Sequence, residues 1–262
     1  MDTRIRASIK ITALQRLLMI NLLSGVLPLY IVTEYPKSGG TWLSQMLSDY
    51  LQVPFPRNEF PKFESCIMHG HYIYNAFLMN VFCVMRDGRD IMVSYYYHSL
   101  FRNERFNARL VEITRREVPF KNYDNIEDNL PAFIEYKFTR KKYPRFTWAD
   151  FVNSWADKDV AIIRYENLLR DSVKELGESI KKVVGYDTDE KRLTEIVERY
   201  SFKRLAKRNP GEENKHSFLR KGIAGDWKNV FNKEAKELFN YYAGKELIKL
   251  GYEKDESWVY GN

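Results

Sequence analysis

Cysteine is scarce in this chain: Cys66 and Cys83 are the only two among 262 residues. They form no C-x-x-C pair and fit no zinc-ligand spacing, which excludes a cysteine-based zinc site or redox motif of those kinds. Cys83 lies inside the apolar run "NVFCVM", where a thiol packs as a small apolar residue. A reducing compartment fits this low content.

The sequence also lacks an uninterrupted apolar run long enough to span a bilayer. Its most apolar stretch, "LLMINLLSGVLPLYIV", follows a basic segment as a signal or anchor would, but polar residues, a glycine and a proline interrupt it. We therefore predict that residues 1–28 form an N-terminal helical extension, with an amphipathic helix over 7–24. Membrane association through this stretch is the alternative to a cytoplasmic location.

Internal repeats, low-complexity tracts and apolar-poor segments are absent, which excludes a repeat protein and a long disordered region. Lys and Arg number 42 against 35 Asp and Glu, so the net charge is 42 − 35 = +7. A basic balance favours an anionic ligand, with solubility alone as the other interpretation. Because the cations are spread along the chain, we do not expect a nucleic-acid partner.

Short apolar runs alternate with helical patterns, which predicts an α/β fold with a parallel sheet in a single domain over 1–262. We predict that residues 99–147 form helices and loops outside the sheet, on the side where substrate would bind. Ligands bind such sheets beyond the carboxyl ends of the strands. We predict strands at 29–35, at 80–85 and within 160–168, and helices over 41–51, 86–101, 147–156, 172–186, 189–202 and 233–252.

The segment "YPKSGGTW" follows the first predicted strand. Gly39 and Gly40 let backbone N–H groups approach a ligand, and the following helix begins with an anion-binding N-terminus. Lys37 adds a cation, and Ser38 and Thr41 add hydroxyl groups. The lysine precedes the glycines, whereas a Walker A loop ends in G-K-[ST] with a magnesium-binding hydroxyl. The segment therefore predicts phosphate binding without an obligatory metal, or an ordinary strand-to-helix turn.

A second candidate is "RDGRDIMVSYYYH", which leaves the strand at 80–85. Arg86 suits bidentate phosphate contact, and Ser94 lies about two helical turns further on the same side. The alternative is a structural ion pair between Arg86 and Asp90. Asp87 and Asp90 suit the N-terminus of the helix.

The third candidate is the loop "FLRKGIAGDWKNVF". Arg220 and Lys221 are adjacent, while Gly222 and Gly225 leave backbone N–H groups open. Such a loop closes over a phosphate with side chains and backbone together, or is a solvated basic turn.

Together the three segments resemble the cytosolic-type sulfotransferases, which use 3′-phosphoadenosine 5′-phosphosulfate (PAPS). They occur in that family's order over residues 35–231. The resemblance implies a P-loop NTPase-like three-layer sandwich, PAPS as co-substrate, the product 3′-phosphoadenosine 5′-phosphate (PAP), and no metal. It implies that Lys37 stabilises the leaving group and that Ser94 restrains Lys37. It places Ser38, Gly39, Gly40, Thr41 and Trp42 on the 5′ side, with Trp42 stacking on the adenine. It assigns the 3′-phosphate to Arg86, Ser94, Arg220, Lys221 and Gly222, and further adenine contacts to Tyr165, Ser201 and Phe202.

The family's catalytic histidine lies in a K-T-H-like segment. Here "IMHGHYIY" contains His69 and His71, which we expect to lie in one short loop. Alignment with the family's segment places His71 at the position of the catalytic base and His69 at the position of the lysine. A neutral histidine can accept the proton that an attacking hydroxyl loses. His98 and His216 are weaker candidates, and two surface histidines are the alternative.

The chain departs from the family pattern in three places. Gly40 replaces a frequent threonine, and the interval between His71 and Arg86 is short. In the family's dimer segment K-x-x-x-T-V-x-x-x-E, Lys228 and Glu237 remain but Asn232–Lys233 replaces Thr-Val. We therefore expect a monomer, or a dimer that does not use this segment.

The predicted function is transfer of a sulfuryl group from PAPS to a hydroxyl or amine of a small-molecule, glycan or lipid acceptor. A P-loop-type kinase is the first alternative, and the missing G-K-[ST] argues against it. A non-catalytic nucleotide-phosphate or nucleic-acid binding protein is the second, and PAP binding without sulfuryl transfer would favour it.

Overall fold

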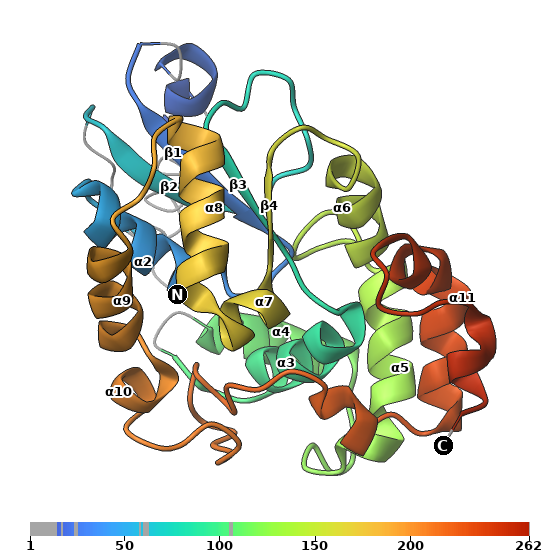
Figure 1. Cartoon of the computed structure of the whole chain (residues 1–262). Helices are drawn as coiled ribbons and strands as arrows, with labels where there is room; N and C mark the ends of the chain where they lie inside the picture. The colour runs from blue at the N-terminus through green and yellow to red at the C-terminus, as the bar shows by residue number, and fades with distance from the viewer. Residues whose placement is uncertain are drawn as a thin grey trace. The chain divides into compact units, whose positions relative to one another are not determined.

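The computed structural model describes residues 15, 16, 18–23, 26–57, 59, 63–104 and 107–261 (Figure 1). A π-helix, η1 (Met19–Leu23), begins this part of the chain, with Met19 and Ile20 buried. Most of the amphipathic helix predicted over 7–24 lies outside the described residues. Every helix in the described ranges is too short or too polar to cross a bilayer.

The described residues form a four-stranded sheet in the order β2-β1-β3-β4, with all neighbouring strands parallel. The strands are β1 (Leu29–Glu34), β2 (Cys66–Gly70), β3 (Val81–Met85) and β4 (Ala161–Arg164). Three of them confirm the predicted strands. The prediction that His69 lies in a loop is wrong, because His69 belongs to β2. The strand escaped sequence inspection because only three apolar residues, Cys66 to Met68, precede its polar end.

The predicted helices are confirmed, with small differences in their ends. The segment 99–147 contains two helices, and the segment 189–202 covers one helix and the start of the next. The helices are α2 (Gly40–Leu51), α3 (Gly88–Leu100), α4 (Ala108–Glu117), α5 (Ile126–Thr139), α6 (Trp148–Trp155), α7 (Tyr165–Arg170), α8 (Ser172–Val184), α9 (Glu190–Arg199), α10 (Phe202–Ala206) and α11 (Lys233–Lys249), with the 3-10 helices η2 (Asp226–Asn229) and η3 (Glu256–Val259).

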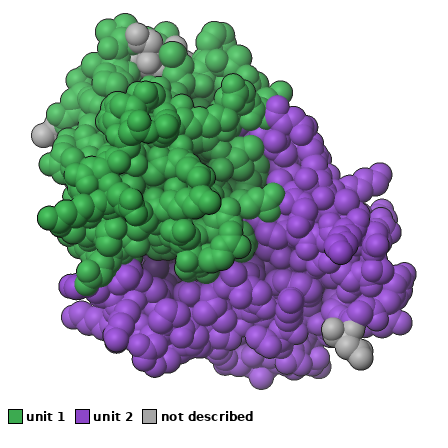
Figure 2. Space-filling model, in the orientation of Figure 1, with its two compact units in different colours: residues 1–34, 39–85, 158–200 green, residues 35–38, 86–157, 201–262 purple. Residues whose placement is uncertain are grey.

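The chain divides into two compact units, coloured separately in Figure 2. Unit 1 consists of residues 1–34, 39–85 and 158–200, and it contains the sheet with α2, α7, α8 and α9. Unit 2 consists of residues 35–38, 86–157 and 201–262, and it contains α3 to α6, α10 and α11. The chain passes between the units at residues 34–39, 85–86, 157–158 and 200–201.

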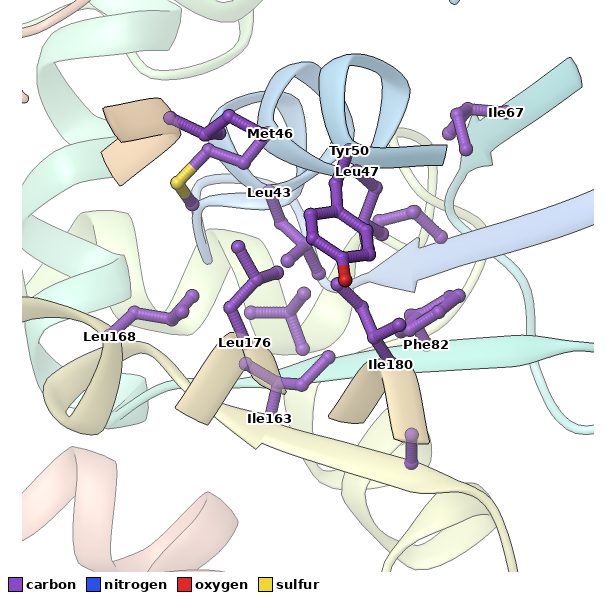
Figure 3. Close-up of a cluster of buried hydrophobic side chains, with 14 of the residues drawn as sticks. Leu43, Met46, Leu47, Tyr50, Ile67, Phe82, Ile163, Leu168, Leu176 and Ile180 are labelled. Carbon is purple, nitrogen blue, oxygen red and sulfur yellow. The ribbon is translucent and has the colours of Figure 1, made fainter. Parts of the chain in front are cut away.

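One face of the sheet in unit 1 is covered by α2, α8 and α9 (Figure 1). Leu43 and Leu47 of α2 pack with Leu176 of α8 and with Phe82 and Ile163 of the strands (Figure 3). These side chains are fully buried, and each contributes roughly 1.5–3 kcal/mol on burial. The 3.6-residue period of α2 and α8 places their apolar residues on this one face.

Unit 2 has an aromatic core built around α3, α5, α6 and α11. Tyr96 of α3 meets Phe133 of α5 at 5.3 Å between ring centres, in an edge-to-face arrangement. Trp148 of α6 lies 5.7 Å from Phe239 of α11. Helix α5 belongs to the segment 99–147, so that segment supplies core residues to its own unit.

Lys137 of α5 is a buried lysine in this core. Its ammonium donates a hydrogen bond to the carbonyl oxygen of Tyr143 at 2.8 Å and lies 3.8 Å from the ring centre of Tyr95. Neither partner carries a full negative charge, so burial dominates and lowers the pKa of Lys137 to about 7.

We expect Lys137→Met to stabilise the protein near neutral pH. The unfolded chain keeps a proton on Lys137 between about pH 7 and its ordinary pKa of about 10.4, whereas the folded protein has lost it, so stability rises with pH across this window. Methionine removes that dependence. Urea denaturation at several pH values should show the advantage of Lys137→Met shrinking as pH rises. Lys141→Met, at a half-exposed side chain, is the control; a pH-independent difference for Lys137→Met would contradict the assignment.

Candidate active site

Several predicted site residues lie where strands of the parallel sheet end, as does Glu34, which the sequence did not single out. Glu34 ends β1, His69 lies in β2, Arg86 directly follows β3, and Tyr165 directly follows β4. In parallel sheets this edge is where ligands bind. Each unit carries a distinct group of these residues.

In unit 1, Gly39 and the start of α2 lie against an aromatic pair. Gly39 caps α2 with φ 104°, and a Cβ atom there would lie 2.8 Å from Cδ2 of Tyr165. Both the left-handed backbone and the ring therefore require glycine. Trp42 meets Tyr165 edge-to-face at 6.3 Å and donates from Nε1 to the carbonyl oxygen of Tyr200 at 2.8 Å. Two residues predicted to contact the adenine thus come together.

The histidines of unit 1 are organised by Glu34, a residue that the sequence did not single out. Its Oε2 accepts a hydrogen bond from the Gly40 N–H at 2.6 Å, and its Oε1 lies 3.0 Å from Nε2 of His69. Its carbonyl oxygen lies 3.0 Å from Nδ1 of His71. One residue therefore contacts both base candidates and the first residue of α2.

Glu34 is only 4% exposed. Burial acts to raise the pKa of its carboxyl, but the hydrogen bond and charge of His69, the charge of His71 and the Gly40 N–H outweigh it and lower the pKa. The available signal was a carboxylate at the end of the apolar run "LYIVTE". A charge there is costly unless it is paired.

In unit 2, Lys37 lies in a tight turn held by its neighbours. Ser38 donates from Oγ to the carbonyl oxygen of Tyr35 at 2.8 Å, and Lys37 has φ 77°, a rare conformation for a residue other than glycine. The Lys37 ammonium lies 3.9 Å from the ring centre of Phe218, and its carbonyl oxygen accepts a hydrogen bond from Arg86 Nη1 at 2.9 Å. Two predicted residues, Lys37 and Arg86, are therefore in contact.

The basic loop of unit 2 is ordered around the buried carboxylate of Asp226. Nη2 of Arg220 and Nζ of Lys221 each lie 2.5 Å from one of its oxygens. Burial acts to raise the pKa of Asp226, and the hydrogen bonds from Lys221 and Arg220 more than offset this and lower it. Arg220 also lies over the ring of Tyr97 in α3, at 4.8 Å.

Asp90 attaches this loop to α3. Its oxygens accept hydrogen bonds from the N–H groups of Gly225 at 2.7 Å and Trp227 at 3.0 Å. Asp87 alone acts as the predicted cap, by accepting from the Arg89 N–H. Arg86 Nη2 lies 3.8 Å from Asp90, so the alternative ion pair exists as a long contact. Burial raises the pKa of Asp90 although Arg86 acts to lower it.

The remaining predicted residues are distributed as follows. The ring of Phe202, at the start of α10, lies against Gly222 of the basic loop, so these two come together in unit 2. Ser201 is the residue before α10 and Ser94 is half-buried in α3, while Thr41 stands in the first turn of α2. His98 and His216 engage other partners, Asn103 Oδ1 at 3.1 Å and the ring of Phe101 at 5.8 Å.

Comparison with known proteins decides the family. The model of a protein family described as "Sulfotransferase domain" matches residues 78–251, more than half of the chain. The chain belongs to the sulfotransferase domain family. Its enzymatic activity is therefore sulfuryl transfer, which confirms the predicted reaction class.

Individual sulfotransferases match over most of this chain. Sulfotransferase 1E1 of Cavia porcellus is 24% identical over 83% of this sulfotransferase and 82% of its own length. The structure of mouse sulfotransferase SULT7A1 complexed with PAP matches with a TM-score of 0.60 at 20% identity, over 83% of each chain. Retinol dehydratase in complex with retinol and PAP matches with a TM-score of 0.58 at 16% identity, over 88% of this chain and 85% of its own. These structures confirm the α/β fold with its parallel sheet.

Proposed function

We propose that this sulfotransferase transfers a sulfuryl group from PAPS to a hydroxyl or amine of a small-molecule, glycan or lipid acceptor, and releases PAP. No metal is expected, because "YPKSGG" lacks the magnesium-binding hydroxyl of a G-K-[ST] loop. PAP is named in the structures of both relatives described above. We regard 1–262 as one sulfotransferase domain and expect it to work in the cytoplasm, without the family's usual dimer segment.

The observation that carries the proposal is the ordered basic loop of unit 2. Arg220 and Lys221 share Asp226, while Arg86 donates from Nη2 to the carbonyl oxygen of Ile223 at 3.4 Å. Arg220 Nε is buried and has no hydrogen-bond partner among the described residues. A buried donor without a partner costs about 1–3 kcal/mol, which a phosphate oxygen would recover. We assign the 3′-phosphate to Arg86, Ser94, Arg220, Lys221 and Gly222; Ser94 lies on α3, which follows Arg86 in the chain.

The 5′ side of the cofactor is assigned to Lys37, Ser38, Gly39, Gly40 and Thr41. The N-terminus of α2 supports anion binding there, with the Gly40 N–H already bonded to Glu34 and the remaining N–H groups of the first turn assigned to the ligand. The adenine is assigned to Trp42 and Tyr165, whose rings meet, together with Ser201 and Phe202.

When bound, PAPS supplies the sulfuryl group and a phosphate leaving group. We assign His71 as the base that takes the acceptor proton while the new S–O or S–N bond forms and the S–O bond to phosphate breaks. Lys37 stabilises the charge that develops on the leaving oxygen, and Ser94 restrains Lys37 beforehand. Positioning and charge supply most of the catalysis, with no covalent enzyme intermediate.

An apolar acceptor is supported by the chain that follows His71. Ile73, Tyr74, Phe77 and Met79 come within eight residues of the base and are exposed. Exposed apolar side chains that cluster in one segment are typical of ligand-binding surfaces. Retinol, named in one relative's structure, is an apolar alcohol.

The first prediction tests the cofactor. PAP should bind much more tightly than AMP, and Arg86→Ala should reduce that preference at least tenfold, because a charged hydrogen bond contributes about 1.5–3 kcal/mol. Calorimetry should compare the ratio of the two affinities, since damage to the Lys37 turn, which Arg86 also holds and which is assigned to the 5′ side shared by both nucleotides, would weaken both equally. Arg192→Ala is a matched control: its guanidinium also donates to two carbonyl oxygens, those of Asp49 and Tyr50. Equal affinity for PAP and AMP in the parent protein would refute the proposal.

The second prediction concerns Lys37. Lys37→Met should lower turnover more than it lowers PAP affinity, because the charge on the leaving oxygen develops only in the transition state. Steady-state kinetics and calorimetry on the same preparation measure both quantities. An increase in the Michaelis constant for PAPS at unchanged turnover would make Lys37 a binding residue only.

The third prediction separates the two histidines. General-base catalysis contributes about 10²- to 10⁴-fold, so His71→Ala should cut turnover on a hydroxyl acceptor at least a hundredfold with PAP binding retained. His69→Ala should have a smaller effect. The acidic limb of the pH–rate profile should vanish in His71→Ala and persist in His69→Ala. If His69→Ala alone were inactive, the base would be His69.

A further inference from the structure

We propose that Glu34 is a positioning residue that fixes the orientation and the hydrogen positions of both His69 and His71. The effect on catalysis rests on the proposed function, in which His71 is the base. The geometry itself lies entirely within unit 1 and is independent of any assignment of the cofactor.

The Glu34 carboxylate has two donors to satisfy, and it supplies one oxygen to each. Oε2 accepts from the Gly40 N–H at 2.6 Å, and Oε1 faces Nε2 of His69 at 3.0 Å. A carboxylate only accepts hydrogen bonds, so His69 must carry a hydrogen on Nε2. A glutamine at this position has one accepting oxygen and could satisfy only one of the two donors. Glutamate is therefore required to keep the hydrogen on Nε2 of His69; with glutamine the amide NH₂ would face Nε2, and the ring hydrogen would move to Nδ1.

The backbone of Glu34 determines the form of His71. The Glu34 carbonyl oxygen lies 3.0 Å from Nδ1 of His71, and a carbonyl oxygen can only accept. Nδ1 of His71 therefore carries the hydrogen, and the neutral ring has its lone pair on Nε2. This identifies Nε2 as the basic atom of His71.

The sheet holds these partners in register. Val32 of β1 pairs with His69 of β2, and Thr33 pairs with Gly70. The same register, continued by one residue, brings Glu34 opposite His71. The rings of His69 and His71 meet edge-to-face at 5.7 Å between their centres. The Glu34 carboxylate therefore reaches His69 from a neighbouring parallel strand whose position the ladder has already fixed.

Gly40 makes the arrangement possible. A Cβ atom on Gly40 would lie 2.7 Å from Nε2 of His69 and 2.8 Å from Cδ of Glu34. Any side chain there would displace one of the two groups. Because Gly40 has no side chain where the family often has threonine, the Glu34–His69 pair can occupy the space that a side chain would fill. The carboxylate also stabilises the N-terminus of α2, where negative charge is favourable.

Nitrogen-15 NMR of histidine-labelled protein tests the geometry without any activity. The chain has four histidines, so the ring signals are assigned by single substitutions. We expect a hydrogen on Nε2 of His69, and on Nδ1 alone of neutral His71. In Glu34→Gln the amide oxygen should keep the Gly40 N–H, and the hydrogen of His69 should move to Nδ1, while His71 is unchanged. A hydrogen on Nε2 of neutral His71, or an unchanged His69 in Glu34→Gln, would overturn the proposal.

Kinetics then test the catalytic consequence. Glu34→Gln keeps the backbone carbonyl that bonds His71, so it acts only through His69, whose ring contacts that of His71. Turnover should therefore fall about tenfold, less than in His71→Ala and more than PAP affinity falls, because even a small displacement of a catalytic group is costly. Glu175→Gln is the matched control, since Glu175 likewise accepts from a backbone N–H (Arg164, 2.8 Å) and a side-chain N–H (Asn167, 3.1 Å). Equal losses in both variants would reject a specific role for Glu34.

These measurements separate the two proposals. If the NMR result is as expected but the parent protein transfers no sulfuryl group from PAPS to any acceptor, the proposed function fails and the positioning geometry stands. If the parent is active but its His71 has the opposite tautomer, the positioning role fails and the proposed function stands.

Discussion

The two hydrogen bonds that Asp90 accepts from the backbone of Gly225 and Trp227 attach the basic loop of unit 2 to α3. They hold an irregular loop to α3 by its main chain, which leaves the side chains of Arg220 and Lys221 to be arranged separately. Phe218, in the same loop, then meets the Lys37 ammonium. Residues 218–225 of this loop have no fully buried side chain, so the anchor to α3 orders them where packing does not.

Carboxylates that lie among cations recur in this protein, for a physical reason. Arg220 and Lys221 repel each other, and Asp226 between them offsets that repulsion in the ligand-free protein. An arginine has five N–H donors and a lysine three, so both keep capacity for a phosphate while paired with the aspartate. The basic loop can therefore be ordered in advance of binding, which reduces the entropy lost when a ligand arrives.

Unit 1 shows how two departures from a family pattern can compensate each other. Considered separately, Gly40 lacks the hydroxyl group of the family's frequent threonine, and His69 stands where the family has a lysine. The structure connects both to Glu34, whose carboxylate occupies the space over Gly40 and pairs with His69. The substitutions therefore form one set of contacts, and each is intelligible only with the others.

Sequence by itself determined much of this protein. The buried runs at 29–35 and 80–85 and the amphipathic periods of α2 and α8 were sufficient for the α/β class with anion sites at strand ends, and the three motifs in order indicated the reaction class through the family resemblance. These features are local: period, turn residues and short motifs depend on neighbours in the chain. The contact between Trp42 and Tyr165 could also be anticipated, but only through the family resemblance.

Tertiary structure alone decided the rest. Strand β2 is too short and polar at its end to be recognised, and it forms because β1 offers a parallel partner with matching register. Glu34, Asp90 and Asp226 acquire their partners from residues up to 137 positions away, as the bond from Trp227 to Asp90 illustrates. Which donor reaches a buried carboxylate depends on the three-dimensional approach of distant segments, and no local pattern in the sequence encodes that approach.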